Sequence, residues 1–373
     1  MTMPLPNISF KEEQSNLSDE LNLYFKNKFS SSDKQPSSFI DDPSIKLWEG
    51  YCKESIVHGA FQILKKCYPQ LSFPITEGIN KTQPYVDAVL KGKSGNINLE
   101  SNLELNNPEG IEISIYESIA GKVPVIKVPN NQDFIQIIQC LLHKNSPTFV
   151  PLSMGACLIN GINNWDRLHT LQHHWIANNP TGNWNEEFSK KVLINPALFK
   201  DKIIILSTKS YSNVSANILG LSEDVWKTYS YSIRLEHECT HLYTLKKYGF
   251  ATNNLHDELI ADYIGISKTI GSYNKEWMLT FMGLENYPNY RKGARLENYL
   301  GNSDLSFDNF EKLTEIIKNA IENIAQFNVE LGKINSERDQ ICRIDALCET
   351  SVLAIASENG ANLLIHKTRT LLK

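Results

Sequence analysis

The feature that most constrains this chain is a pair of histidines inside a segment that predicts one long helix. Ser222 is a favoured residue at the start of a helix, and Gly249 is a favoured residue just past its end. His237 and His241 lie four positions apart between these limits. Four residues advance a helix by about 400°, so the two imidazoles project within about 40° of each other and about 6 Å apart along the axis. Both rings can therefore bind one metal ion.

The residue between these histidines adds a general base to the pair. Glu238 is rotated about 100° from His237, so its carboxylate lies beside the metal and can act on a metal-activated water. A shuffled chain of this composition would contain a histidine, an acidic residue and a histidine at this spacing roughly 0.02 times. His169 and His173 have the same separation, but no acidic residue lies between them. We interpret that second pair as structural.

A second predicted helix, from Asn254 to Gly271, supplies carboxylates for the same site. Glu258 could complete a site of two histidines and one glutamate for Zn²⁺. Asp262 lies one turn later and could accept the spare N–H of a liganding imidazole, which would fix the tautomer of that ring. Asp257 and Asp262 are alternatives to Glu258 as the third ligand. A short loop between two packed helices would bring these carboxylates to the histidines.

These residues together resemble the gluzincin metallopeptidases, the thermolysin-like zincins. The family pattern is H-E-x-x-H, followed some fifteen to twenty-odd residues later by E-x-x-x-D. The positions that meet it here are His237, Glu238, His241, Glu258 and Asp262. The resemblance implies His237, His241 and Glu258 as zinc ligands. It also implies Glu238 as the general base and acid, and Asp262 as the partner that orients His237.

The resemblance leaves other parts of the site open. Candidates for oxyanion or substrate contacts are His256, Tyr263, Tyr290, Arg291 and Arg295. The resemblance also implies a sheet before the two helices, whose edge strand holds an extended substrate. The apolar run 203–206 predicts an internal strand, and the weak alternation of 211–216 predicts that edge strand. Residues 153–166 and 237–299 also resemble an uncharacterised bacterial family of unknown function.

The whole chain predicts an α+β fold in three parts. Residues 1–44 are polar and show little periodicity, which predicts a flexible N-terminal arm. Residues 45–200 predict a mixed α/β N-terminal domain. Residues 201–373 predict a zincin-like catalytic domain with a sheet, two metal-bearing helices and C-terminal helices.

Hydrophobic periodicity places the main elements outside the predicted site. Helical spacing predicts helices over 45–68 and 132–143. Alternation of apolar and other residues predicts strands over 111–115 and 123–128. One apolar stripe from 310 to 331, spaced by three and four residues, predicts a long amphipathic helix.

The composition argues against several classes of partner and location. A net charge of −5 and a pI near 6.0 leave no basic stripe for nucleic acid phosphates. The longest apolar stretch, 134–142, is interrupted by glutamines and is far shorter than the roughly 18 residues of a membrane span. Charged residues near the N-terminus do not fit a secretory signal, and the seven cysteines form no C-x-x-C pair. We therefore expect a cytoplasmic protein with reduced thiols and no nucleic acid or membrane partner.

The function that these features predict is zinc-dependent hydrolysis of a peptide or amide substrate by a metal-activated water. The protein would then be a metallopeptidase or an amidohydrolase. One alternative is a zinc-stabilised, non-catalytic peptide-binding or scaffold protein. Another is a dedicated biosynthetic or maturation enzyme. The sequence leaves the substrate, the cleavage specificity and the oligomeric state open.

Overall fold

The structure, a computed structural model, describes residues 17–29, 39–93, 102–251, 254–300 and 306–373. Its contacts divide the chain into two compact units. We call Phe39–Lys209 the sheet unit, and we call Met1–Ser38 together with Ser210–Lys373 the helical unit. The predicted α+β fold is confirmed, with the strands in one unit and the helices of the predicted site in the other.

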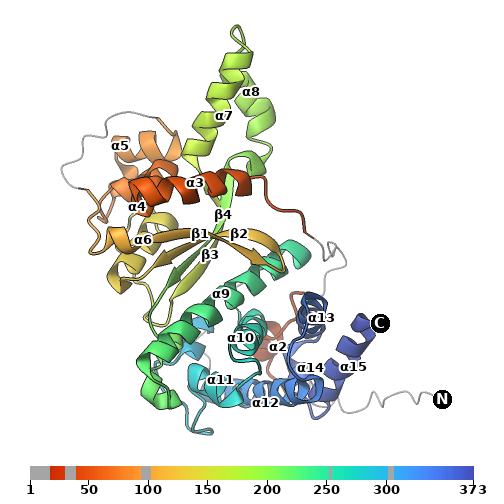
Figure 1. Ribbon diagram of the computed structural model, residues 1–373. Coiled ribbons are helices and arrows are strands. Elements are labelled where there is room, and N and C mark those ends of the chain that lie inside the picture. Colours follow the sequence, from red (N-terminus) through yellow and green to blue (C-terminus); the bar gives the residue numbers. More distant parts are fainter. Residues whose placement is uncertain (1–16, 30–38, 94–101, 252–253, 301–305) are drawn as a thin grey trace. The chain divides into compact units, whose positions relative to one another are not determined.

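Four strands form one mixed sheet in the sheet unit, in the spatial order β1-β2-β4-β3 (Figure 1). β1 (Glu112–Ser118) and β2 (Gly121–Val128) form an antiparallel hairpin. β4 (Lys200–Ser207) runs parallel to β2 and antiparallel to β3 (Ala156–Asn163). The apolar runs that predict strands fall in β1, β2 and β4, because their β-branched residues pack well on a pleated, buried surface.

Three helices cover one face of this sheet. α3 (Ile45–His58) and α4 (Ala60–Cys67) lie where the sequence predicts a single helix over 45–68. That prediction is wrong in one respect, because Gly59 has a φ of 82° and separates the two helices. α6 (Asn131–Leu142) confirms the other predicted helix. The shared core includes Trp48, Phe61, Ile126, Phe134 and Ile203.

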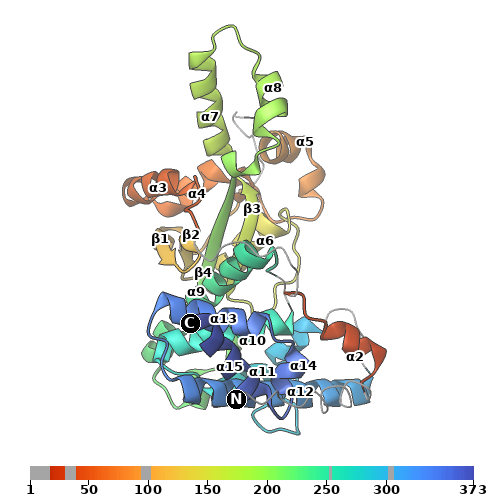
Figure 2. The same cartoon turned by 90° about the vertical axis from the view of Figure 1, so that its right-hand side faces the viewer.

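A helical hairpin follows β3 in the sheet unit. α7 (Trp165–Asn178) and α8 (Trp184–Glu187) extend away from the sheet (Figure 2). Trp175 and Trp184 join them, with ring centroids 5.7 Å apart. The short helical segments of this unit are η1 (Pro69–Ser72), η2 (Ile79–Lys81), α5 (Gln83–Tyr85), η3 (Val86–Leu90), η4 (Pro108–Gly110), η5 (Phe188–Val192) and η6 (Pro196–Leu198).

The helical unit carries the two helices on which the sequence places the metal site. These are α9 (Glu223–Tyr248) and α10 (Leu255–Ile270), and they pack against each other. A serine caps the start of α9 and an asparagine caps the start of α10. Each helix ends at a glycine with positive φ. Both helices are confirmed because these end signals are local and therefore readable in the sequence.

The other elements of the helical unit surround this pair. They are α2 (Asp19–Tyr24), η7 (Tyr211–Asn213), η8 (Ala216–Leu219), α11 (Lys275–Met282), η9 (Arg295–Tyr299), α12 (Phe307–Leu331), α13 (Glu337–Cys348), α14 (Val352–Ala356) and α15 (Gly360–Leu372). The long amphipathic helix predicted over 310–331 is confirmed as α12. Within the described ranges, no helix combines the length and the apolar character that crossing a bilayer requires.

The predicted edge strand over 211–216 is wrong. This segment forms the two short turns η7 and η8, because Ser212 and Asn213 have φ values of 51° and 58°. Such left-handed backbone cannot continue a strand. In the described part of the helical unit, the only β pairing is an isolated bridge between Asn286 and Asn289. Strand addition of a substrate at 211–216 is therefore not supported.

Two of the predicted domain boundaries also differ from the structure. The sequence predicts a flexible arm over 1–44, but the described residues 17–29 are folded, and Leu21, Phe25 and Phe29 are buried. The sequence places the strand at 203–206 in the catalytic part. In the structure this strand is β4, which pairs with β2 and β3, so it belongs to the sheet unit.

Candidate metal site

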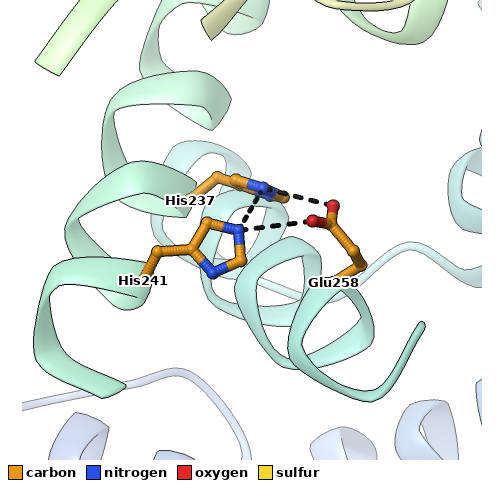
Figure 3. A group of neighbouring side chains, drawn as sticks. All are labelled: His237, His241 and Glu258. Carbon is orange, nitrogen blue, oxygen red and sulfur yellow. Dashed lines mark hydrogen bonds and ion pairs between the residues drawn. The ribbon is translucent and has the colours of Figure 1, made fainter. Parts of the chain in front are cut away.

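Three potential metal ligands from α9 and α10 meet at one point (Figure 3). The Nε2 atoms of His237 and His241 lie 2.9 Å apart. The Glu258 carboxylate faces both rings, with Oε2 3.4 Å from His237 Nε2 and Oε1 3.5 Å from His241 Nε2. All three side chains are buried. Across the described ranges, this is the one group of His, Cys, Asp and Glu side chains that converges closely enough to hold an ion.

The separations between these atoms fit a tetrahedral zinc ion. Bonds of about 2.05 Å at the tetrahedral angle put any two ligand atoms about 3.3 Å apart. The three separations in the protein, 2.9, 3.4 and 3.5 Å, lie on both sides of that value. Two imidazoles and one carboxylate also leave a fourth position for water or substrate, which is the donor set of a catalytic zinc site. The residues present therefore fit Zn²⁺.

Asp262 and Tyr211 hold the His237 ring from its other side. Nδ1 of His237 lies 2.9 Å from Oδ1 of Asp262 and 3.0 Å from the hydroxyl oxygen of Tyr211. The Tyr211 hydroxyl donates to the same Asp262 oxygen at 2.5 Å. A carboxylate can only accept, so the proton of a neutral His237 lies on Nδ1 and the lone pair of Nε2 points to the shared centre. The contact that the sequence suggests between Asp262 and His237 is present.

Asp257 takes the corresponding position behind His241. Its Oδ2 lies 3.2 Å from His241 Nδ1, an ion-pair contact whose angle falls short of an aligned hydrogen bond. Thr244 donates to the other carboxylate oxygen of Asp257 at 3.3 Å. The proton of a neutral His241 therefore also lies on Nδ1, toward the carboxylate. The sequence names Asp257 as an alternative ligand, whereas the structure places it on the outer nitrogen of a ring.

The charges of the site depend on one another. Burial lowers the pKa of His237 to about 4, and the neighbouring His241 adds to this shift. Burial is the strongest single influence on His241 and acts to lower its pKa, but the charges of Asp257 and Glu258 and their polar contacts with the ring together outweigh burial, and the pKa lies well above 6.5. Burial acts to raise the pKa of Glu258, but a hydrogen bond from His241 and the charges of both histidines hold it at about 2. A protonated His241 thus supplies one positive charge to this group, and a metal cation can supply that charge in its place.

The short helix η9 brings two more side chains to the carboxylates of α10. Arg295 donates to Oδ2 of Asp262 and, at 3.0 Å, to the hydroxyl of Ser212. The Tyr299 hydroxyl donates to Oε2 of Glu258 at 2.9 Å. Burial raises the pKa of Tyr299 well above 10, so this hydroxyl keeps its proton. Both contacts hold carboxylates that serve the predicted site.

A family model described as "Family of unknown function (DUF7005)" matches residues 7–359. The chain belongs to this family. No curated protein and no solved structure matches the chain. The family description names no activity, so the chemistry of this DUF7005 protein has to follow from its own residues.

Glu238 is not one of the three convergent side chains of the DUF7005 protein. It is buried and next to His237 on α9. Burial lowers the pKa of Arg234, one turn earlier, to about 10, and the negative charge of Glu238 opposes that shift. Arg234 is itself buried over the ring of Tyr211, with 5.4 Å between its guanidinium carbon and the ring centre. Glu238 therefore remains a candidate for the general base that the sequence predicts, outside the set of convergent side chains.

The other candidates for oxyanion or substrate contacts have partners elsewhere. His256 contacts a backbone carbonyl of α13 at 2.9 Å. Tyr263 bonds side chains of α12 and α13. Tyr290 and Arg291 bond residues of α11 and of the loop that follows it. In the sheet unit, His169 contacts a backbone carbonyl at 2.7 Å, in keeping with its structural interpretation.

Sequence reasoning misses Tyr211 and Tyr299. Tyr211 lies in the segment that predicts a strand, and Tyr299 lies in a polar connection without periodicity. One signal could have pointed to Tyr299. It follows Arg295 by four residues, which is the spacing that separates Glu258 from Asp262.

Proposed function

We propose that this DUF7005 protein is a zinc-dependent hydrolase that cleaves a peptide or amide bond. The observation that carries the proposal is the convergence of the Nε2 atoms of His237 and His241 on the Glu258 carboxylate. Imidazole and carboxylate ligands together suit zinc among the common divalent metals. Carboxylates on the outer nitrogen of both rings also support metal binding, because they set the tautomer that a ligand needs.

The chemistry follows from the residues around this centre. Zinc, when bound, would supply a Lewis acid that polarises the scissile carbonyl and lowers the pKa of the attacking water. Glu238 would accept the proton of that water and return it to the leaving amine. Asp262 and Asp257 would keep the protons of His237 and His241 on the outer nitrogens, so that Glu238 is the proton carrier of the site.

Two substitutions test the two halves of this proposal. Elemental analysis should find about one zinc ion per chain in the wild type and in Glu238→Gln, and none in His237→Ala. A peptide-library digest should then show cleavage by the wild type alone. Glu238→Gln is the matched variant, because it keeps the size and polarity of the side chain and removes the proton acceptor. A wild type without zinc would contradict the metal, and cleavage that survives in Glu238→Gln would contradict the mechanism.

The burial of the ligands favours a second candidate, a zinc-stabilised peptide-binding or scaffold protein without turnover. His237, His241 and Glu258 are 6%, 8% and 7% exposed, which is also typical of a closed site. A structural zinc site has a fourth protein ligand, whereas a catalytic site keeps a position for water. Acetohydroxamate added to the Co²⁺-substituted protein separates the two. A changed visible spectrum favours the hydrolase, and an unchanged spectrum favours the scaffold.

A further inference from the structure

Two side chains of the five-residue helix η9 contact two carboxylates of α10 with a matched spacing. Arg295, Leu296 and Tyr299 are buried in η9, whereas Glu297 and Asn298 are exposed. Arg295 bonds Asp262, and Tyr299 bonds Glu258. The donors are four residues apart on η9, and the acceptors are four residues apart on α10. Two donors of η9 therefore meet two carboxylates that lie about one turn apart on α10.

We infer that η9 is the positioning element of the metal site, with Tyr299 orienting the ligand Glu258 and Arg295 orienting Asp262 against His237. This inference rests on the proposed function, because it takes Glu258 and His237 to be zinc ligands. Arg295 and Tyr299 are positioning residues in this view. Neither is assigned a contact with the substrate.

Tyr299 fixes the rotation of the Glu258 carboxylate. Its hydroxyl donates to Oε2 at 2.9 Å, while Oε1 faces His241 Nε2 at 3.5 Å. A glutamate carboxylate turns easily about its last torsion, which is broad and roughly two-fold. A donor on one oxygen removes that freedom and keeps the other oxygen directed at the shared centre. Without this hydroxyl, Glu258 would have to be ordered by the metal alone, at a cost in binding entropy.

Arg295 performs the same task for His237 through Asp262. Asp262 is fully buried, and its two oxygens have different partners, with Tyr211 and His237 on Oδ1 and Arg295 on Oδ2. Oδ2 receives the Arg295 guanidinium, and Oδ1 lies 2.9 Å from His237 Nδ1. A buried carboxylate needs a nearby cation to remain charged. Arg295 supplies that charge on the oxygen that His237 does not use.

The two contacts are also linked to each other within η9. The Arg295 guanidinium carbon lies 5.9 Å from the centre of the Tyr299 ring and 5.3 Å from the centre of the Tyr211 ring. At these distances the cation is attracted to both aromatic faces. A displacement of Arg295 would therefore disturb Tyr299, and both ligand-orienting contacts should weaken together.

Zinc affinity of the full-length protein, measured by competition with a chromophoric chelator, tests this inference. Removing a group that orients a zinc ligand lowers metal affinity by roughly 10–100-fold. We expect Tyr299→Phe to show a loss in this range while its far-ultraviolet circular dichroism stays unchanged. The visible spectrum of the Co²⁺-substituted variant should shift as well, because the geometry of a ligand changes.

Tyr248→Phe is the matched control. Tyr248 is buried in the same unit, and its hydroxyl donates to the carboxylate of Asp345 at 2.9 Å, the same distance as in the Tyr299 contact. Asp345 accepts hydrogen bonds from Tyr243, Lys247 and Tyr248, and none of these is one of the three proposed metal ligands. We therefore expect wild-type zinc affinity and a wild-type Co²⁺ spectrum from this variant.

The outcomes separate this inference from the proposed function. Wild-type affinity in Tyr299→Phe overturns the inference and leaves the zinc site intact. Equal losses in Tyr299→Phe and Tyr248→Phe also overturn it, because they indicate a general loss of structure. A wild type that binds no zinc overturns the proposed function, and the inference with it. If Tyr299→Phe does not fold, Arg295→Lys decides, with a reduced zinc affinity expected and an unchanged affinity contradicting the inference.

Discussion

Helix α9 carries two buried polar clusters that differ in how their charges are balanced. In the first, which we call the Asp345 cluster, Tyr243, Lys247 and Tyr248 all donate to the Asp345 carboxylate of α13. The distances are 2.9, 2.5 and 2.9 Å. Every contact joins a donor to an acceptor, and the positive charge of lysine faces the negative charge of aspartate. This cluster is balanced by the protein alone.

The second, the metal cluster of His237, His241 and Glu258, brings acceptors together instead. Both imidazoles have a carboxylate on Nδ1, so in the neutral rings both Nε2 lone pairs face the Glu258 oxygens. These acceptors repel one another unless a positive charge lies between them, which a proton on His241 or a metal cation can supply. Burial and hydrogen bonding alone therefore do not mark a site. What marks it is a set of convergent acceptor atoms that needs a proton or a metal cation at its centre.

The largest effect on stability should come from the Asp345 cluster. Lys247→Met removes the positive partner of a buried carboxylate, and breaking a buried ion pair in this way costs about 3–5 kcal/mol. Urea unfolding should show this loss in the free energy of unfolding. Zinc content should stay at the wild-type level, because Lys247 bonds no residue of the metal cluster in the contacts described. Loss of zinc from Lys247→Met would show that the two clusters are not separate.

Removing the metal should have a comparable effect through the other cluster. A ligand that binds only the folded state, present at 1,000 times its Kd, stabilises that state by about 4.1 kcal/mol. The free energy of unfolding should therefore be about 4.1 kcal/mol lower after chelation than in zinc at 1,000 times its Kd. In His237→Ala, added zinc should give no stabilisation. Equal stabilisation of His237→Ala and the wild type would place the zinc elsewhere.

A smaller effect, on zinc affinity, is expected from Asp262→Asn, because Asp262 contacts the Nδ1 atom of His237 and not the metal. The amide cannot stabilise the Nδ1–H of the ring as a carboxylate does, so zinc affinity should fall about 10–100-fold, or about 1.4–2.7 kcal/mol. Chelator competition measures this change. Asp345→Asn is the control, because it makes the same replacement in the balanced cluster. A zinc affinity that falls equally in both variants would contradict a specific role for Asp262.

The parts of this molecule that the sequence predicts are those with local causes. The end of α9 follows from Gly249, and its two histidines share a face because of the helical repeat alone. β4 follows from a run of β-branched residues, and α12 follows from one continuous apolar stripe. In each case the residues that decide the element lie within the element.

The parts that the sequence misses have causes elsewhere in the chain. The prediction of a strand at 211–216 fails because weak alternation says nothing about φ, and Ser212 and Asn213 have positive φ. The role of Tyr299 depends on a contact with a residue 41 positions earlier in the chain. Arg295 is predicted as a substrate contact, whereas in the structure its charge faces Asp262. Periodicity cannot reveal such pairings, because they arise when separate segments pack together.

The smallest effect tests how far the support of the metal cluster extends. The Tyr24 hydroxyl of α2 donates to the backbone carbonyl of Tyr299 at 3.2 Å. Tyr24→Phe should cost about 1 kcal/mol in the free energy of unfolding, as expected for a neutral hydrogen bond. Zinc affinity should change by less than about 3-fold, because this contact holds the end of η9 and not a carboxylate. A tenfold loss of zinc affinity would instead show that the metal cluster depends on α2. Of the two clusters, only the Asp345 cluster would then be held by contacts between α9 and α13 alone.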